Sequence, residues 1–272
     1  MHEGKMMNRE YLRRAKTIVV KVGTSNLTDD SLKLAPKKVE KLVDGVMALR
    51  RAGKNVLLVT SGAISAGVGR MGLKRRPKEM PLLQAAAAVG QGILMRFYEK
   101  FFSEHNQPVA QVLITRDDFA SPQRKRNLMN TFTTVLKWGA IPIVNENDTV
   151  AIEEIRFGDN DALSALVATG INADLLIMLS DVDGLYTGDP NKKGKVKLIK
   201  TVERITPKIE RLAGAASRGS GGMVTKIQAA KVTSRFGIPL VVANGNERNV
   251  LRRVLAGEEI GTIFLPRKFG GR

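Results

Sequence analysis

The stretch IPIVNENDTVAIEEIRFGDNDALSALVA, residues 141–168, places two clusters of Asn and Asp between a buried strand pattern and an amphipathic helix pattern. The clusters are NEND at 145–148 and GDND at 158–161, and the alternating segment between them predicts a short hairpin. Short polar side chains at the ends of regular elements are typical of binding sites in α/β proteins. A turn and a helix N-cap would explain GDND alone, and paired carboxylates would also suit glycoside hydrolysis or magnesium binding. Two such clusters in one short segment favour a functional site.

Composition narrows the class of protein. The chain has 272 residues, 43% of them hydrophobic and 26% charged, which is typical of a globular protein with one large α/β domain or two small ones. It has no cysteine and only two histidines, so disulfides and thiolate metal sites are excluded and a histidine metal site is not expected. The first 16 residues lack the apolar core of a secretory signal, and no apolar run approaches the roughly 20 residues that cross a membrane. We therefore predict a cytoplasmic protein.

The net charge of +18 suits either nucleic acid or anionic small molecules as partners. Lysine and arginine are spread along the chain, and their densest groups are at 74–76 and 124–126. Aromatic residues make up only 5% of the chain, which leaves few platforms for stacking bases. A basic surface that attracts anionic small molecules is therefore the favoured interpretation, and nucleic-acid binding is the less favoured one.

Strand and helix patterns alternate along nearly the whole chain. Apolar, β-branched runs predict strands at 17–22, 55–60, 108–115, 141–146, 174–180, 238–244 and 261–265. Apolar residues at helical spacing predict helices at 37–53, 84–105, 127–139, 161–170, 225–237 and 249–257. Continuous apolar strands separated by amphipathic helices indicate a mostly parallel sheet covered on both faces. We predict one continuous domain over 17–272, with a basic, frayed extension at 1–16 and a division into two lobes near residue 175 if two substrates share the site.

Two loops have the composition of phosphate-binding loops. KVGTSNLT, residues 21–28, offers a lysine, a glycine and hydroxyls after the first strand, although it is neither a Walker A nor a GxGxxG motif. GSGGMVTKIQAAK, residues 219–231, leads into a helix and carries Lys226 in the first helical turn. Glycines let backbone N–H groups approach phosphate oxygens, and lysines neutralise those oxygens. The structural alternatives are an ordinary turn and a loose loop with a solvated lysine.

Two further loops follow predicted strands. TSGAISAG, residues 60–67, puts Ser61 and Gly62 at a helix start that would attract an anion, although an N-cap role for Ser61 is the plainer explanation. SDVDGLYTGDP, residues 180–190, begins like an EF-hand loop but lacks its Glu and flanking helices, so a loop against a nucleotide is favoured. No residue stands out as a covalent nucleophile. Two lysines at two phosphate-like loops therefore predict phosphoryl transfer, in which catalysis is mainly positioning and charge neutralisation.

The ordered set KVGTS, TSGAI, VNEND, FGDND, SDVDGLYT and GSGGMVTK resembles the amino acid kinase family over about residues 17–265. Each motif alone is modest, but the whole set in this order is highly specific. The resemblance implies an αβα sandwich around a mostly parallel central sheet. The NEND…GDND pair is similar to members that transfer the γ-phosphoryl group of ATP to the side-chain carboxylate of L-glutamate. The product, glutamyl 5-phosphate, begins proline biosynthesis.

The resemblance also implies roles for individual residues. Lys21 and Lys226 would stabilise the transferring phosphoryl group, and Asp161 would hold both lysines in place. The glutamate-binding residues, in the part of the chain from about 17 to 174, would be Ser61, Gly62, Asn145, Asp148 and Asn160, with Asp148 on the substrate ammonium. The ATP-binding residues, mostly in the part from about 175 to 265, would be Lys21, Ser180, Asp181, Ser220, Gly221, Gly222, Met223, Val224, Thr225 and Lys226. Mg²⁺ would be held mainly by the ATP phosphates rather than by a protein metal site.

Partners follow from the same resemblance. It implies a homo-oligomer (a dimer or tetramer), feedback inhibition by proline, and channelling of the product to glutamyl phosphate reductase. Many bacterial members carry a C-terminal PUA domain, and we expect this chain, which ends GTIFLPRKFGGR, to be a form without it. N-acetylglutamate kinase and uridylate kinase are rivals within the family, but NEND…GDND and Asp148 favour a substrate with a free amino group. A basic nucleic-acid-binding protein is the rival outside the family, and it explains neither the acidic clusters nor the glycine loops.

Overall fold

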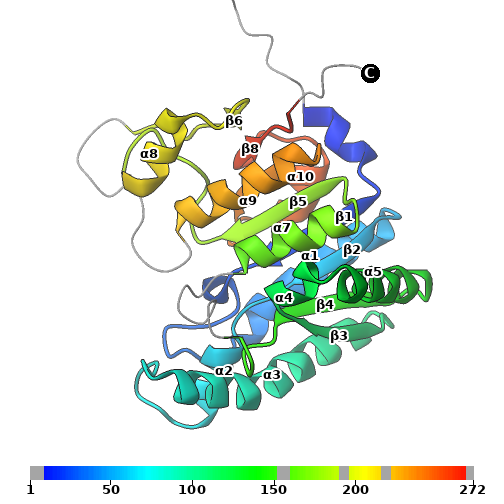
Figure 1. The fold of residues 1–272 in the computed structure, drawn as a ribbon, viewed down its shortest axis with the longest axis vertical. Helices are drawn as coiled ribbons and strands as arrows, with labels where there is room; N and C mark the ends of the chain where they lie inside the picture. The colour runs from blue at the N-terminus through cyan, green and yellow to red at the C-terminus, as the bar shows by residue number, and fades with distance from the viewer. Residues whose placement is uncertain (1–8, 152–159, 190–195, 216–221, 268–272) are drawn as a thin grey trace, which may run out of the picture.

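A sheet of eight strands runs through the part of the chain that the structure describes, in the order β3-β4-β2-β1-β5-β7-β8-β6 (Figure 1). This computed structural model describes residues 9–151, 160–189, 196–215 and 222–267. The strands are β1 (Thr17–Val22), β2 (Asn55–Val59), β3 (Val109–Ile114), β4 (Ile141–Glu146), β5 (Leu175–Ser180), β6 (Thr201–Val202), β7 (Leu240–Asn244) and β8 (Thr262–Phe264). All neighbouring strands pair in parallel except β7 and β8, which pair antiparallel. The prediction of a mostly parallel sheet is confirmed.

Helices cover both faces of the sheet, as continuous apolar strands require. One layer contains α1 (Pro36–Arg51), α3 (Met80–Ser103) and α10 (Val250–Leu255), and the other contains α5 (Pro122–Lys137), α7 (Asp161–Gly170) and α9 (Met223–Arg235). Side chains of β1 alternate between the two layers, because Val20 and Val22 join the first hydrophobic cluster and Val19 joins the second. The αβα sandwich is therefore confirmed.

The remaining described elements are short, and one of them positions the loop after β2. They are the 3-10 helices η1 (Arg9–Arg14) and η2 (Thr24–Asn26) and the helices α2 (Ala63–Arg70), α4 (Arg116–Ala120) and α8 (Pro207–Ala215). α2 packs against α3 without room for side chains: a Cβ on Gly67 would lie 1.8 Å from the carbonyl oxygen of Ala86, and one on Gly90 would lie 1.8 Å from that of Ala63. Gly62 precedes α2 with φ +97°, a left-handed conformation that suits glycine. These glycines fix the path of the 60–62 loop.

The N-terminal segment differs from the prediction of a frayed extension at 1–16. Residues 9–14 form η1, and the Arg9 side chain is buried. Its guanidinium donates to the carbonyl oxygens of Ile260 (2.7 Å), Lys200 and Gly261. The prediction is wrong for residues 9–14. A frayed segment would leave the Arg9 charge in solvent, but here backbone carbonyls from distant parts of the chain bind it.

Some predictions fall on residues outside the described ranges. The hairpin predicted between NEND and GDND lies largely at 152–159, and Ser220 and Gly221 lie within 216–221. Among the described residues, no helix combines the length and apolar character that a membrane span needs.

Candidate active site

The carboxyl ends of the parallel strands bring the predicted motifs to one edge of the sheet. Lys21 lies near the end of β1, Ser61 follows β2, Asn145 is in β4, and Ser180 ends β5. The first turns of α7 and α9 begin at the same edge with Asp161 and Met223. In open α/β sheets, ligands bind in the crevice outside these strand ends. The structure therefore assembles, at a position suited to a site, motifs that are far apart in the sequence.

Asp161 bridges the two lysines that the sequence singled out. Lys21 Nζ lies 2.6 Å from Asp161 Oδ1, and Lys226 Nζ lies 3.0 Å from Asp161 Oδ2. Thr225 Oγ1 lies 2.9 Å from the same Oδ2. All three charged side chains are buried, and that of Asp161 is 0% exposed. We call Lys21, Asp161 and Lys226 the ionic triad.

The ionic triad keeps two like charges close together and leaves a net positive charge at the strand edge. Two buried ammonium groups repel each other, and the carboxylate between them offsets that repulsion and fixes both lysine side chains. Asp161 also lies in the first turn of α7, where the helix dipole favours a negative charge. Two positive charges and one negative charge leave one net positive charge at the strand edge. Such preorganised positive charge stabilises an anionic group in transfer.

A chain of neutral amides lies beside the ionic triad. Asn145 Nδ2 donates to Gln91 Oε1 (2.8 Å), and Asn160 Nδ2 donates to Asn145 Oδ1 (2.8 Å). The Asn160 amide also donates to the Thr60 carbonyl (2.5 Å) and approaches Ser61 Oγ (3.4 Å). We call Gln91, Asn145 and Asn160 the amide relay. The amide nitrogen of Asn160 is therefore engaged within the protein.

The contacts of Ser61 and Asn160 test whether these two residues serve only as helix N-caps, which the sequence left open. Asn160 stands at the N-cap position of α7 but its side chain makes no capping hydrogen bond, and Gly62, not Ser61, is the N-cap residue of α2. Both polar side chains are instead drawn into one cluster with Asn145. The capping explanation therefore does not account for Ser61 or Asn160.

Sequence reasoning missed Gln91, Tyr98 and Thr60. Tyr98 is fully buried on α3, and its Oη lies 2.6 Å from Thr60 Oγ1, at the start of the loop that carries Ser61. Burial raises the pKa of Tyr98, so the phenol stays protonated and can act as a donor. Gln91 and Tyr98 are seven residues apart, and this spacing places both on one face of a helix. This helical spacing of two polar side chains is the sequence signal that could have identified Gln91 and Tyr98.

The other predicted residues lie around the same edge. Asp148 is in the turn after β4 and is half-buried. Ser180 Oγ donates to Asp181 Oδ1 (3.2 Å) at the end of β5. Gly222 is the N-cap residue of α9, so Met223, Val224, Thr225 and Lys226 form the first turn of that helix, while Ser220 and Gly221 fall outside the described residues.

The loop after β5 is organised around Asp183. Asn244 Nδ2, at the end of β7, donates to Asp183 Oδ1 (2.9 Å), and Tyr186 Oη donates to Oδ2 (2.7 Å). These hydrogen bonds lower the pKa of Asp183, and the bond to Asp183 raises the pKa of Tyr186 to about 12. Among the described residues, no group of three acidic or histidine side chains is placed to hold a metal ion. An EF-hand-like role for this loop has no support in its contacts.

Comparison with known proteins defines the class. The model of the family described as "Amino acid kinase family" matches residues 16–244. The chain therefore belongs to the amino acid kinase family. Its fold also matches UMP kinase from Bacillus anthracis (TM-score 0.63, 18% identity, 93% of this chain and 97% of that one) and carbamate kinase from Giardia lamblia bound to AMP-PNP (TM-score 0.64, 18% identity, 93% and 99%).

Sequence relatives at about half identity carry one name, glutamate 5-kinase. The relative from Caldanaerobacter subterraneus subsp. tengcongensis is 52% identical over 92% of this chain and 68% of its own length. Those from Symbiobacterium thermophilum and Clostridium acetobutylicum are 51% and 49% identical, over 94% and 95% of this chain and 98% and 97% of their own lengths. The chain is thus similar to glutamate 5-kinases of two different lengths.

Proposed function

We propose that this protein transfers the γ-phosphoryl group of ATP to the side-chain carboxylate of L-glutamate, the first step of proline biosynthesis. The observation that carries the proposal is the bridging of Lys21 and Lys226 by one buried carboxylate at the strand edge. The attacking carboxylate and the ATP phosphates repel each other, so such a reaction depends on positive charge held in place before the substrates meet. The name shared by the sequence relatives supports the same activity.

The reaction needs no general base from the protein. A glutamate side chain is already ionised at neutral pH, so its oxygen can attack the γ-phosphorus directly. The new carboxyl–phosphate bond forms as the bond from the γ-phosphorus to the β–γ bridging oxygen breaks, and ADP leaves with that electron pair. Lys21 and Lys226 would stabilise the charge on the moving group, and Asp161 would keep the two ammonium groups in position.

The amide relay would place the glutamate. Asn160, held by Asn145 and by the Thr60 carbonyl, presents its oxygen to the amino acid, and Ser61 and the backbone at Gly62 lie next to it. Asp148 would pair with the substrate ammonium. The part of the chain before residue 175 would thus bind glutamate, and the part after it, with Ser180, Asp181 and the first turn of α9, would bind ATP. Mg²⁺ would neutralise the ATP phosphates and take most of its ligands from them.

A hydroxylamine trapping assay tests this activity. Acyl phosphates react with hydroxylamine, so L-glutamate with ATP and Mg²⁺ should give the hydroxamate, and omission of any one of them should abolish it. N-acetylglutamate and UMP, tested in parallel for ADP release, cover the two rival kinases. Turnover with UMP or N-acetylglutamate and none with glutamate would refute the proposal. Adding proline to the same assay tests the expected feedback inhibition.

A further inference from the structure

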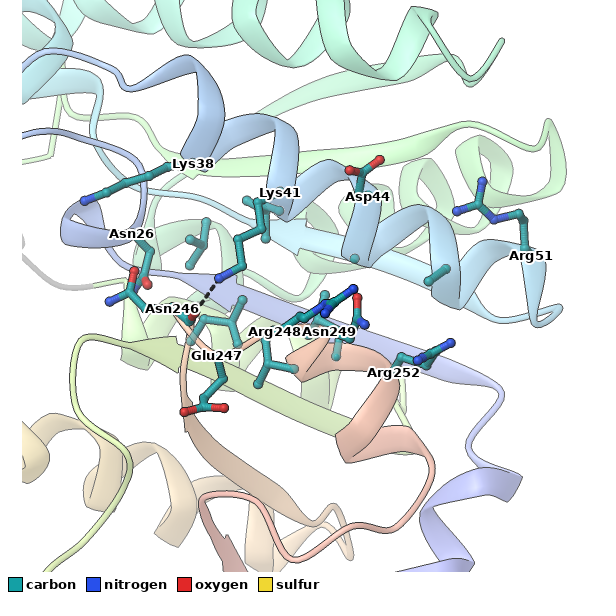
Figure 2. Close-up of a pocket in the computed structure, with 18 residues that line it drawn as sticks. Asn26, Lys38, Lys41, Asp44, Arg51, Asn246, Glu247, Arg248, Asn249 and Arg252 are labelled. Atoms are coloured by element: carbon teal, nitrogen blue, oxygen red, sulfur yellow. Dashed lines mark hydrogen bonds between the residues drawn. The ribbon is translucent and has the colours of Figure 1, made fainter.

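A cavity of about 480 Å³ lies between α1 and α10, in the helix layer opposite to the ionic triad (Figure 2). Lys21 and Val22 are consecutive in β1, so their side chains point to opposite faces of the sheet, and Val22 lines the cavity. Its base is apolar, with Val22, Leu42, Leu179 and Leu251. The volume lies within the range of pockets for small-molecule ligands. The cavity lies on the other face of the sheet from the Lys21 side chain, and Asn26, at one end of it, belongs to the loop that follows Lys21.

Positive charge surrounds the opening of this cavity. Arg51, Arg248 and Arg252 line it, and no carboxylate in the described part of the chain forms an ion pair with any of them. Of the two carboxylates on the lining, Glu247 pairs with Arg253 Nη1 at 3.1 Å, and Asp44 lies 3.3 Å from His105 Nε2. The three guanidinium groups belong to exposed residues on the lining and could bind an anion that enters the cavity.

A buried polar group at one end of the cavity lacks a partner. Asn26 is 7% exposed, and neither its amide nitrogen nor its amide oxygen has a hydrogen-bond partner among the described residues. The amide oxygen packs closely against Gly245, because a Cβ at that position would lie 2.2 Å from Asn26 Oδ1. An unpaired buried amide is costly, and a ligand that displaced the groups covering it would remove that cost.

The walls of the cavity are tied together by lysines. Lys41 on α1 donates to the carbonyl of Asn246 in the turn after β7 (2.5 Å), and Lys38 donates to the carbonyls of Ser25 (2.8 Å) and Thr28 (2.7 Å). Figure 2 shows Asn26, Lys38 and Lys41 towards one end, with Arg51 and Arg252 towards the other. These bonds join α1 to both loops that border the cavity, so the site is already formed before a ligand binds.

We propose that this cavity is a second binding site, for a small metabolite that carries two or more phosphate or carboxylate groups. Guanidinium groups bind such oxyanions in a bidentate manner, the apolar base would contact the carbon skeleton, and Asn26 would hydrogen-bond to a polar group at the buried end. The base also adjoins the proposed kinase site. Val22 directly follows Lys21 in the sequence, and Leu179 directly precedes Ser180. The site is defined by its own contacts and does not depend on the proposed kinase activity.

Calorimetric titration of the full chain with inorganic pyrophosphate and, separately, with citrate tests this site. The double variant Arg248→Gln/Arg252→Gln should weaken binding of the tighter anion by about tenfold or more. Ala48→Phe, which fills the cavity without removing charge, should weaken it as well. The preferred anion shows whether the natural ligand carries phosphate or carboxylate groups, and either preference supports the proposal.

Two controls separate this site from other sources of anion binding. Arg235→Gln removes one positive charge from the exposed end of α9 and should leave the affinity unchanged. Lys226→Gln removes an anion-binding group of the kinase site and should leave the binding at the cavity in place. The proposal is overturned if the double variant binds like the wild type, if Ala48→Phe has no effect, if only Lys226→Gln loses binding, or if Arg235→Gln weakens binding as much as the double variant.

Discussion

The ionic triad and the amide relay are built alike but differ in charge. Each joins side chains from three elements at the carboxyl edge of the sheet, and each is buried except for Gln91, which is half-buried. The triad consists of three charged groups, whose burial is costly unless they are paired. The relay is neutral and directional, and it fixes the orientation of amides. The difference suggests a division of labour, in which buried charge serves the step that moves charge and neutral amides serve binding.

Asp161→Asn should give the largest effect. It keeps the shape of the side chain but leaves two buried ammonium groups without a carboxylate, so the free energy of unfolding should fall by about 3–5 kcal/mol. In the protein that remains folded, kcat should fall more than the KM for glutamate rises. Urea denaturation and steady-state kinetics measure both effects, with Asp174→Asn, at the amino end of β5, as the matched control. An unchanged kcat would contradict the role of Asp161.

Lys21→Met should lower kcat by about 10²–10³-fold with little change in the KM for glutamate, because one preorganised positive charge is lost from the transfer step. The apolar side chain fills most of the same space, so the fold should persist. Lys16→Met, at the exposed residue just before the same strand, is the control for loss of a lysine. A turnover within tenfold of wild type, with ADP release as the measure, would show that the triad is structural.

Gln91→Leu tests the role of the amide relay in binding glutamate. It removes the acceptor for Asn145 Nδ2 and frees the relay to reorient, so the KM for glutamate should rise about five- to tenfold, which corresponds to roughly 1 kcal/mol. The KM for ATP and kcat should change little. Gln84→Leu, one heptad earlier on α3, is the control. A fall in kcat at unchanged KM would remove the distinction between triad and relay.

Tyr186→Phe should give the smallest effect, since the Asp183 contact is largely exposed and is worth less than about 1 kcal/mol. The pKa of Asp183 is lowered on folding, so its hydrogen bonds contribute above the unfolded value of about 4 and are lost as pH falls through the folded value. The difference in melting temperature between wild type and Tyr186→Phe should therefore shrink under acid conditions. A difference that is constant from neutral to acid pH would show that the Asp183 carboxylate is not involved.

The sequence carried more information about the elements than about their contacts. Apolar, β-branched runs are local patterns, so the parallel sheet, its strands other than the two-residue β6 and the loops at the strand ends were predicted. The relay was only half predicted: Asn145 and Asn160 stand in conspicuous clusters, whereas Gln91 is an ordinary polar residue in an alanine-rich helix. Its role comes from packing of α3 beside β4, which no local pattern records. The burial of Arg9 was missed for the same reason, because the carbonyl oxygens that accept its hydrogen bonds lie 191 to 252 residues away in the sequence.

The anchoring of Arg9 has a consequence for engineering of the chain. Through this side chain, the first described helix contacts the segment just before β8, so the beginning and the end of the described chain meet. Figure 1 shows η1 next to β8, and η1 leads into the amino end of β1, away from the carboxyl edge that carries the triad and the relay. A circularly permuted version, with the two ends joined by a short linker and new ends opened in a surface loop, should therefore keep the candidate site intact.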